Sequence, residues 1–185
     1  MVKEKGLEQI MTLLANSGIP ELGPGPRKNV LPHQELEKSL AEILSQSELD
    51  SLKSDLIRAV VLLWHDRLDA AHGIAQGIED ADGSFIHGIV HRREPDYGNA
   101  RYWFRRVGEP DFFPNLAHRI GALLDSKGAS TLKTELVVDG KWDSLAFVDR
   151  CQKVSTRPPA DPEVMLLREI QGLESEVLLQ HLFTS

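Results

Sequence analysis

Residues 48–78 have the sequence ELDSLKSDLIRAVVLLWHDRLDAAHGIAQGI and form the longest helical pattern in the chain. Apolar residues recur along one side of it at helical spacing, namely Leu49, Leu52, Leu56, Ala59, Val60 and Leu63. Ser47 and Asp50 supply side-chain oxygens that can cap its first turn. The segment predicts one long helix with a buried apolar side, and it places the protein in the all-α class.

Helical patterns recur on both sides of this segment, over residues 3–16, 33–44, 84–91, 97–107, 114–126, 142–152 and 162–182. Ser84 is the expected cap of the helix through residue 91. Residues 17–32 contain seven glycines and prolines and predict a loop or linker. Residues 131–138 are rich in β-branched side chains and precede Asp139-Gly140, so at most one short β-hairpin is expected near 131–141. These patterns predict an irregular helical bundle that forms a single domain over residues 1–185.

Composition narrows the class of protein. Apolar residues make up 41% and charged residues 26%, which is ordinary for a globular domain. No stretch approaches the roughly 18 apolar residues of a membrane helix, and the N-terminus lacks a secretory signal pattern. Cys151 is the only cysteine, so an internal disulfide is excluded and a reducing compartment fits. We expect a cytoplasmic protein with no membrane partner.

The charge distribution bears on the choice of ligand. A net charge of −7 argues against a general nucleic-acid binder, because phosphate contacts need clustered Lys and Arg. Residues 84–106 nevertheless contain five arginines against two carboxylates, and five of the eleven aromatic residues. A local basic and aromatic patch on an acidic protein favours a small anionic molecule over a long polyanion. The apolar C-terminal helix is either core or a dimer surface, so a homo-oligomer is compatible with the sequence.

Two polar stripes lie on the predicted helices around residues 64–94. The first stripe shares one face of the long predicted helix and consists of His65, Asp69, His72 and Gln76. The second has the spacing i, i+4, i+7 on the next helix and consists of His87, His91 and Glu94. A short loop joins the two helices, so we expect them to be antiparallel neighbours whose stripes meet.

Such a group of side chains is typical of a metal site in a helical bundle. The candidate ligands are His65, His72, His87, His91 and Glu94, and imidazole ligands suit a divalent transition metal such as zinc or iron. If the protein is an enzyme, the candidate catalytic groups are His65, Asp69 and His72, acting in hydrolysis or another acid–base step. The alternatives are a metal-free acid–base pair and a closed hydrogen-bond network without chemistry.

A third group of residues follows the second stripe and could border the same pocket. The candidate anion-binding residues are Arg92, Arg93, Asn99, Trp103 and Arg106. Arginine recognises carboxylate and phosphate groups through paired hydrogen bonds. The alternative is that these arginines pair with the acidic remainder of the chain and tie the helices together.

The same region resembles a group of uncharacterised bacterial and fungal all-helical proteins. The resemblance rests on Trp64-His65-Asp66-x-Leu68-Asp69, on His87-Gly88-Ile89-x-His91-Arg92-Arg93-Glu94 and on Asn99-Ala100-x-Tyr102-Trp103-Phe104-Arg105-Arg106-Val107-Gly108. It extends over about residues 50–182, with Phe147-Val148-Asp149-x-Cys151 and Ile170-Gln171-x-x-Glu174 as further matches. The resemblance implies an all-helical fold and no particular activity.

Two functional hypotheses follow from the sequence. In the first, a pocket of His, Asp and Glu, with or without a bound metal, is bordered by arginine and aromatic residues and binds or hydrolyses a small anionic molecule. In the second, the polar stripes are structural, and the protein is a non-catalytic ligand-binding or protein-interaction module.

Overall fold

The computed structural model describes residues 2–185 and contains, within that range, ten helices and one two-stranded sheet. In chain order the elements are α1 Val2–Ser17, α2 His33–Ser45, α3 Ser51–Trp64, α4 Leu68–Ala75, α5 Ala81–Arg93, α6 Tyr97–Val107, α7 Phe113–Ser126, α8 Ser130–Leu136, β1 Val137–Val138, β2 Lys141–Trp142, α9 Ser144–Val154 and α10 Pro162–Thr184. The prediction of an all-α bundle with one short hairpin is confirmed.

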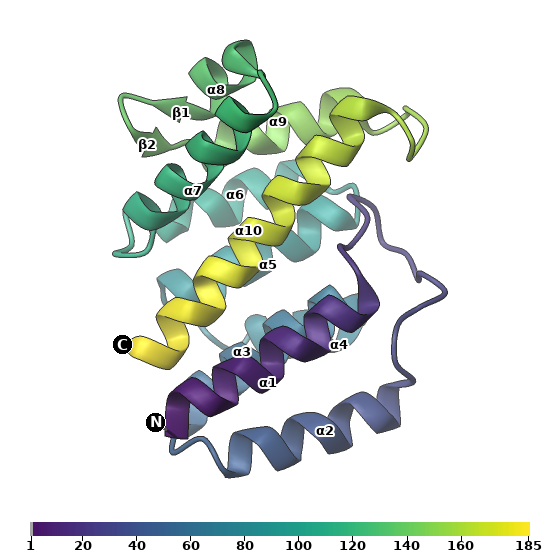
Figure 1. Cartoon of the computed structure of the whole chain (residues 1–185), viewed down its shortest axis with the longest axis vertical. Coiled ribbons are helices and arrows are strands. Elements are labelled where there is room, and N and C mark those ends of the chain that lie inside the picture. The colour runs from purple at the N-terminus through teal and green to yellow at the C-terminus, as the bar shows by residue number, and fades with distance from the viewer. Residues whose placement is uncertain (1) are drawn as a thin grey trace.

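The long helix α10 crosses the molecule diagonally and connects its two ends (Figure 1). It packs against α1 and α3 in the lower part of that view and against α7 and α9 in the upper part. Helix α5 lies beneath it, packed against α3, α4 and α6. All ten helices contribute side chains to one connected apolar core. None of the helices in residues 2–185 combines the length and hydropathy that a bilayer span requires.

Within residues 2–185, five helices begin at an aspartate whose carboxylate accepts hydrogen bonds from backbone N–H groups of the first turn: Asp50, Asp80, Asp96, Asp143 and Asp161. These bonds satisfy donors that have no partner inside the helix. The expected cap at Asp50 is confirmed. The expected cap at Ser84 is wrong, because α5 begins earlier, with Asp80 accepting from the Gly83 N–H at 2.8 Å.

The prediction of one helix over residues 48–78 is also wrong, because the chain turns between α3 and α4. Asp66 adopts a left-handed conformation with φ 60°. The N–H of Asp66 donates to the carbonyl of Leu63, and the N–H of Arg67 donates to that of Leu62. This is the Schellman pattern that ends a helix. The angular relation expected between His65 and the residues of α4 is therefore lost.

The residues between α7 and the hairpin are mostly helical, although their sequence predicted strand structure. Most of the β-branched stretch is helix α8, which buries Leu132 and Leu136 one turn apart. The predicted hairpin is limited to β1 and β2, and its turn at Asp139-Gly140 has φ values of 51° and 76°. Two positive values suit the tight turn of a two-residue hairpin. Burial of a helical apolar face thus outweighs the local β propensity.

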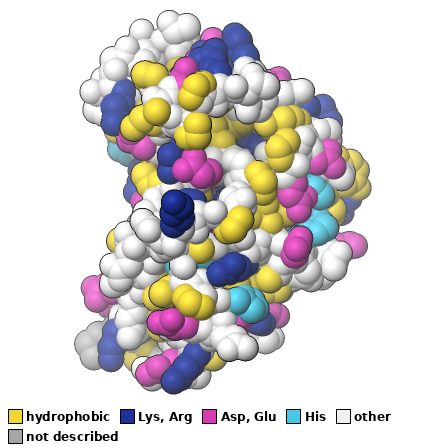
Figure 2. Space-filling model, turned by 90° about the vertical axis from the view of Figure 1, so that its right-hand side faces the viewer, with side chains coloured by type: hydrophobic (Ala, Val, Ile, Leu, Met, Phe, Trp, Pro, Cys, Tyr) yellow, Lys and Arg dark blue, Asp and Glu magenta, His cyan; other side chains and the backbone are white. Residues whose placement is uncertain are grey.

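Charged side chains of both signs are interspersed on the face of the molecule shown in Figure 2. Basic, acidic and histidine side chains alternate there with apolar ones, and no single sign dominates that face. Most of the exposed ion pairs have partly solvated partners, such as Arg101 with Asp149 and Lys133 with Asp125. Pairs of this kind contribute little to stability.

Candidate metal centre

Three histidine side chains meet where α4 packs against α5. His72 comes from α4, and His87 and His91 lie one helical turn apart on α5. One nitrogen from each imidazole can be chosen so that all three lie within 4.8 Å of one another. His87 and His91 stack with their ring planes 16° apart, and His72 meets both rings edge-on. We call these three residues the histidine triad.

The size of the triad fits a transition-metal ion. The centre of a triangle with sides of 4.8 Å lies about 2.8 Å from each corner, against about 2.0–2.1 Å for a zinc–imidazole bond. Each nitrogen would have to move inward by less than ~1 Å, which a small rotation of the imidazole provides. His87 Nδ1 is also buried without a hydrogen-bond partner among the described residues. Buried polar atoms normally have partners, so this nitrogen is available as a ligand.

The protonation state of the triad also suits metal binding. Burial lowers the pKa of His87, and charge repulsion from the neighbouring His72 and His91 adds to this effect, so that the pKa is about 4. Burial likewise lowers the pKa of His91, although the carboxylate of Glu94 partly opposes that effect. Metal ions bind the neutral form of imidazole. His87 and His91 are therefore in the ligand form at neutral pH.

Glu94 lies beside the triad rather than within it. Its Oε2 is 3.1 Å from His91 Nδ1, the distance of an ion pair when the imidazole is protonated. Metal-bound histidines commonly direct their second nitrogen to a carboxylate, which fixes the orientation of the ring. Glu94 is placed to act in this way on His91, leaving His91 Nε2 for a metal. The predicted place of Glu94 among the ligands differs from this position outside the triad.

The close approach of α6 to α5 covers one side of the triad. A Cβ atom on Gly88 would lie 2.9 Å from ring atoms of Phe104, so only glycine allows the two helices to come this near. At that distance the indole of Trp103 lies on His87, with ring centroids 3.9 Å apart and planes at 15°. The indole shields His87 from water.

A guanidinium group also lies against Trp103. Arg106 Cζ lies 5.4 Å from the Trp103 ring centroid and 5.8 Å from that of Tyr102. Within the described residues, Arg106 has neither an ion pair nor a hydrogen bond to its side chain. Asn99 is exposed and donates to Asp96 at 3.1 Å, one turn earlier on the helix. Of the predicted anion-binding residues, Trp103 thus contacts the triad, and Arg106 contacts Trp103.

Arg92 and Arg93 have structural partners instead. Arg92 is 1% exposed and donates to both carboxylate oxygens of Glu174 on α10. Arg93 is 1% exposed and pairs with Asp66, while it also donates to the carbonyls of Leu63 and Gly23. Neither guanidinium reaches an anion outside the protein. We expected these two arginines to border a ligand pocket. In the structure they are buried in ion pairs within the protein.

Two further predicted site residues lie away from the triad. His65 is fully buried at the end of α3, and its Nδ1 is 3.1 Å from the carbonyl of Val61. Asp69 is exposed in the first turn of α4. Both positions follow from the turn at Asp66, which separates the two halves of the predicted stripe. The predicted catalytic set of His65, Asp69 and His72 is consequently not assembled in this structure.

Asp66 and Arg27 form an ion pair that belongs to none of the predicted sites. Burial would raise the pKa of Asp66, but hydrogen bonds from Arg27 and Arg93 hold it below its ordinary value. Arg27 also donates to the carbonyls of Ser17, Gly18 and Trp64, so the loop is fixed to the ends of α1 and α3. A signal was present in the sequence, since Arg27 is a charged residue within a Pro/Gly loop. Its partner, 39 residues further along, could not be read from the sequence.

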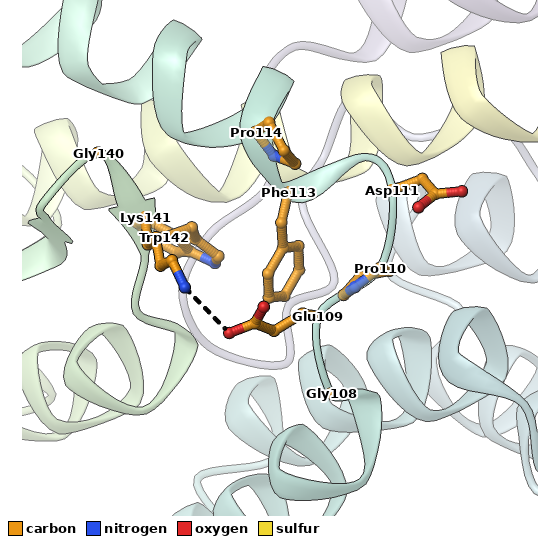
Figure 3. A pocket seen from close by; sticks show the side chains of 9 residues that line it. All are labelled: Gly108, Glu109, Pro110, Asp111, Phe113, Pro114, Gly140, Lys141 and Trp142. Carbon is orange, nitrogen blue, oxygen red and sulfur yellow. Dashed lines mark hydrogen bonds and ion pairs between the residues drawn. The ribbon is translucent and has the colours of Figure 1, made fainter.

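Cavities occur elsewhere on the surface. One hollow of about 370 Å³ lies between the α6–α7 connection and the hairpin, where Phe113, Pro110 and Trp142 face it (Figure 3). Lys141 and Glu109 lie 3.3 Å apart at its edge, and both are largely exposed. An adjoining hollow of about 500 Å³ includes Arg105. Neither hollow includes a residue of the triad.

Comparison of the chain with protein-family models, with curated proteins and with solved structures finds no match.

Proposed function

We propose that this protein binds one divalent transition-metal ion, zinc or iron, through His72, His87 and His91. The observation that supports the proposal is the convergence of three imidazole nitrogens within 4.8 Å, from two helices that pack against each other. Imidazole is a preferred ligand of both metals. Glu94 orients His91 from the outer side, and Trp103 shields His87 from water.

Three imidazole ligands leave a fourth position for water or a ligand. Zinc held by three protein ligands lowers the pKa of its bound water to about 7 and acts as a Lewis acid. Hydrolysis of a small anionic molecule is the enzymatic form of this proposal. The half-buried position of His72 leaves the triad accessible from solvent on one side.

A different observation favours a second candidate, a non-catalytic ligand-binding or protein-interaction module. The two hollows near the hairpin do not include the triad. Arg92 and Arg93 tie α5 to α10 and to the α3–α4 turn. In this alternative the three imidazoles hold α4 against α5, with or without a metal, and no substrate reaches them.

The test of metal binding is direct. The protein is expressed without a histidine tag in cells grown with added zinc and iron, and its metal content is measured after purification. The metal-free form is then titrated with each ion by calorimetry. We expect one ion per chain. His72→Ala, His87→Ala and His91→Ala should each lower the affinity at least tenfold, because each removes one ligand.

His118→Ala is the matched control, because His118 is exposed on α7 and lies outside the triad. This variant should bind metal like the wild type. Protein that stays metal-free in both measurements contradicts the proposal. So does a stoichiometric ion that survives all three triad substitutions, because its ligands must then lie elsewhere.

A further inference from the structure

The triad lacks a carboxylate of its own, and this decides what its fourth position attracts. All three ligand groups are imidazoles, and Glu94 lies on the outer side of His91. A divalent ion bound by neutral ligands keeps its double positive charge. Such an ion becomes the largest local charge at the site. A negatively charged fourth ligand would offset that charge better than water does.

Arg106 adds a second positive charge at the edge of the same site. Its guanidinium lies on Trp103, which in turn stacks on His87, so Arg106 contacts a direct neighbour of the triad. Most of the other arginines between residues 84 and 106 have acidic partners: Arg92 with Glu174, Arg93 with Asp66 and Arg101 with Asp149. Arg106 has none among the described residues and is exposed. It can turn toward a ligand without breaking an ion pair.

We propose that the fourth position of the metal centre binds the oxyanion group of a small molecule, with Arg106 as its second contact. This inference rests on the proposed metal binding at the triad. One oxygen of the anion would bind the metal, and the remaining oxygens would accept hydrogen bonds from the guanidinium. Phosphate and carboxylate groups share this chemistry. The indole of Trp103 covers His87, and the attraction of positive groups for an anion is stronger where water is kept away.

The experiment uses the full chain loaded with Co²⁺, whose visible absorption changes when its ligands change. Co²⁺ uptake is first measured by calorimetry without added anion. Inorganic phosphate or acetate is then titrated at constant ionic strength, with perchlorate as the balancing salt. We expect a saturable spectral change. Arg106→Gln should weaken anion binding about tenfold or more, because it removes a charge-assisted hydrogen bond.

Arg105→Gln is the control, because Arg105 is also exposed and unpaired within the described residues but lines the hollow beside the hairpin. It should bind the anion like the wild type. A response to phosphate alone assigns a phosphate group, and a response to acetate assigns a carboxylate. Co²⁺ uptake without any anion response, or equal anion affinity in both arginine variants, overturns the anion site alone. Failure of Co²⁺ to bind overturns the proposed metal centre itself.

Discussion

Trp103 lies flat against His87, with ring centroids 3.9 Å apart and ring planes only 15° from parallel. The contact joins α6 to α5 and keeps water from one face of the imidazole. His87 is 3% exposed, and its burial is the main reason for its low pKa. The contact therefore connects an aromatic side chain to the protonation state of a proposed metal ligand.

Trp103→Ala should raise the pKa of His87 in the metal-free protein. Removal of the indole admits water to the ring, and solvation favours the protonated form. We expect a rise of about one unit or more from the value of about 4. Titration of the imidazole carbon-bound protons by NMR measures it. Tyr102→Ala is the control, because Tyr102 is 51% exposed and makes no ring contact with His87. An unchanged pKa in Trp103→Ala would show that other groups keep the ring dry.

As the pH is lowered, the free energy of unfolding of the metal-free protein should begin to fall at a pH well above the range in which carboxylates titrate. The folded-state pKa of His87 is about 4, below the unfolded value of about 6.5. Between these values the unfolded chain binds a proton that the folded chain does not, so stability falls as the pH falls from 6.5 to 4. The loss amounts to about 3 kcal/mol at most for this one group.

Urea unfolding at pH 7 and pH 5, in the presence of a chelator, measures this effect. The difference in unfolding free energy between the two pH values should be smaller in His87→Gln than in the wild type. In His118→Gln, which changes an exposed histidine, it should equal that of the wild type. Equal differences in all three proteins would refute the assignment of His87 as the group responsible.

Arg92 and Glu174 should be among the residues most sensitive to single substitution. Both side chains are essentially unexposed and form a two-pronged ion pair. Arg92→Gln or Glu174→Gln leaves the partner charge buried and unpaired, which costs about 3–5 kcal/mol. Chemical denaturation measures it. Asp149→Asn should cost less than about 1 kcal/mol, because its pair with Arg101 is exposed.

A double variant separates the charge effect from the packing effect. Arg92→Met combined with Glu174→Leu removes both buried charges at similar volume. We expect it to be more stable than either single variant, because neither charge is left without its partner. If the double variant is as unstable as the sum of the single ones, the side chains contribute through shape and not through their mutual pairing.

Arg27→Gln should free the loop of residues 18–32. The change removes the ion pair with Asp66 and the bonds to the carbonyls at the ends of α1 and α3. Charge-assisted bonds of this kind contribute about 1.5–3 kcal/mol each. Thermolysin should therefore cut the loop about ten times faster or more, as measured by mass spectrometry of timed digests. Lys28→Gln, one residue further and exposed, should leave the cleavage rate unchanged.

Much of the fold could be predicted from the sequence, because helical periodicity and helix-ending residues are local signals. The helix Tyr97–Val107 begins and ends where its pattern indicated. The break at Asp66 could not be predicted, since neither glycine nor proline marks it. The Asp66 carboxylate is held by ion pairs with Arg27 and Arg93, and both arginines lie far from Asp66 in the sequence.

The candidate site, too, could be predicted only where its residues are related by local helical spacing or by a short loop. His87 and His91 are four residues apart on one helix, so their common face follows from the helical repeat. His72 joins them because α4 and α5 are neighbours, as the short loop indicated. His65 lies beyond the unforeseen turn and is absent from the triad. The role of Arg92 depends on Glu174, which lies 82 residues away.

Gly88 contributes no functional group, yet the layout of the site depends on it. A side chain there would meet Phe104 and push α6 outward, and Trp103 would then move off His87 with Arg106 following it. The site therefore depends on the absence of a side chain at residue 88 as well as on the side chains that form it. A sequence pattern written to find other chains with this centre should read His-Gly-x-x-His. A pattern restricted to the two histidines would also accept chains in which the helix equivalent to α6 lies too far from the site to complete it.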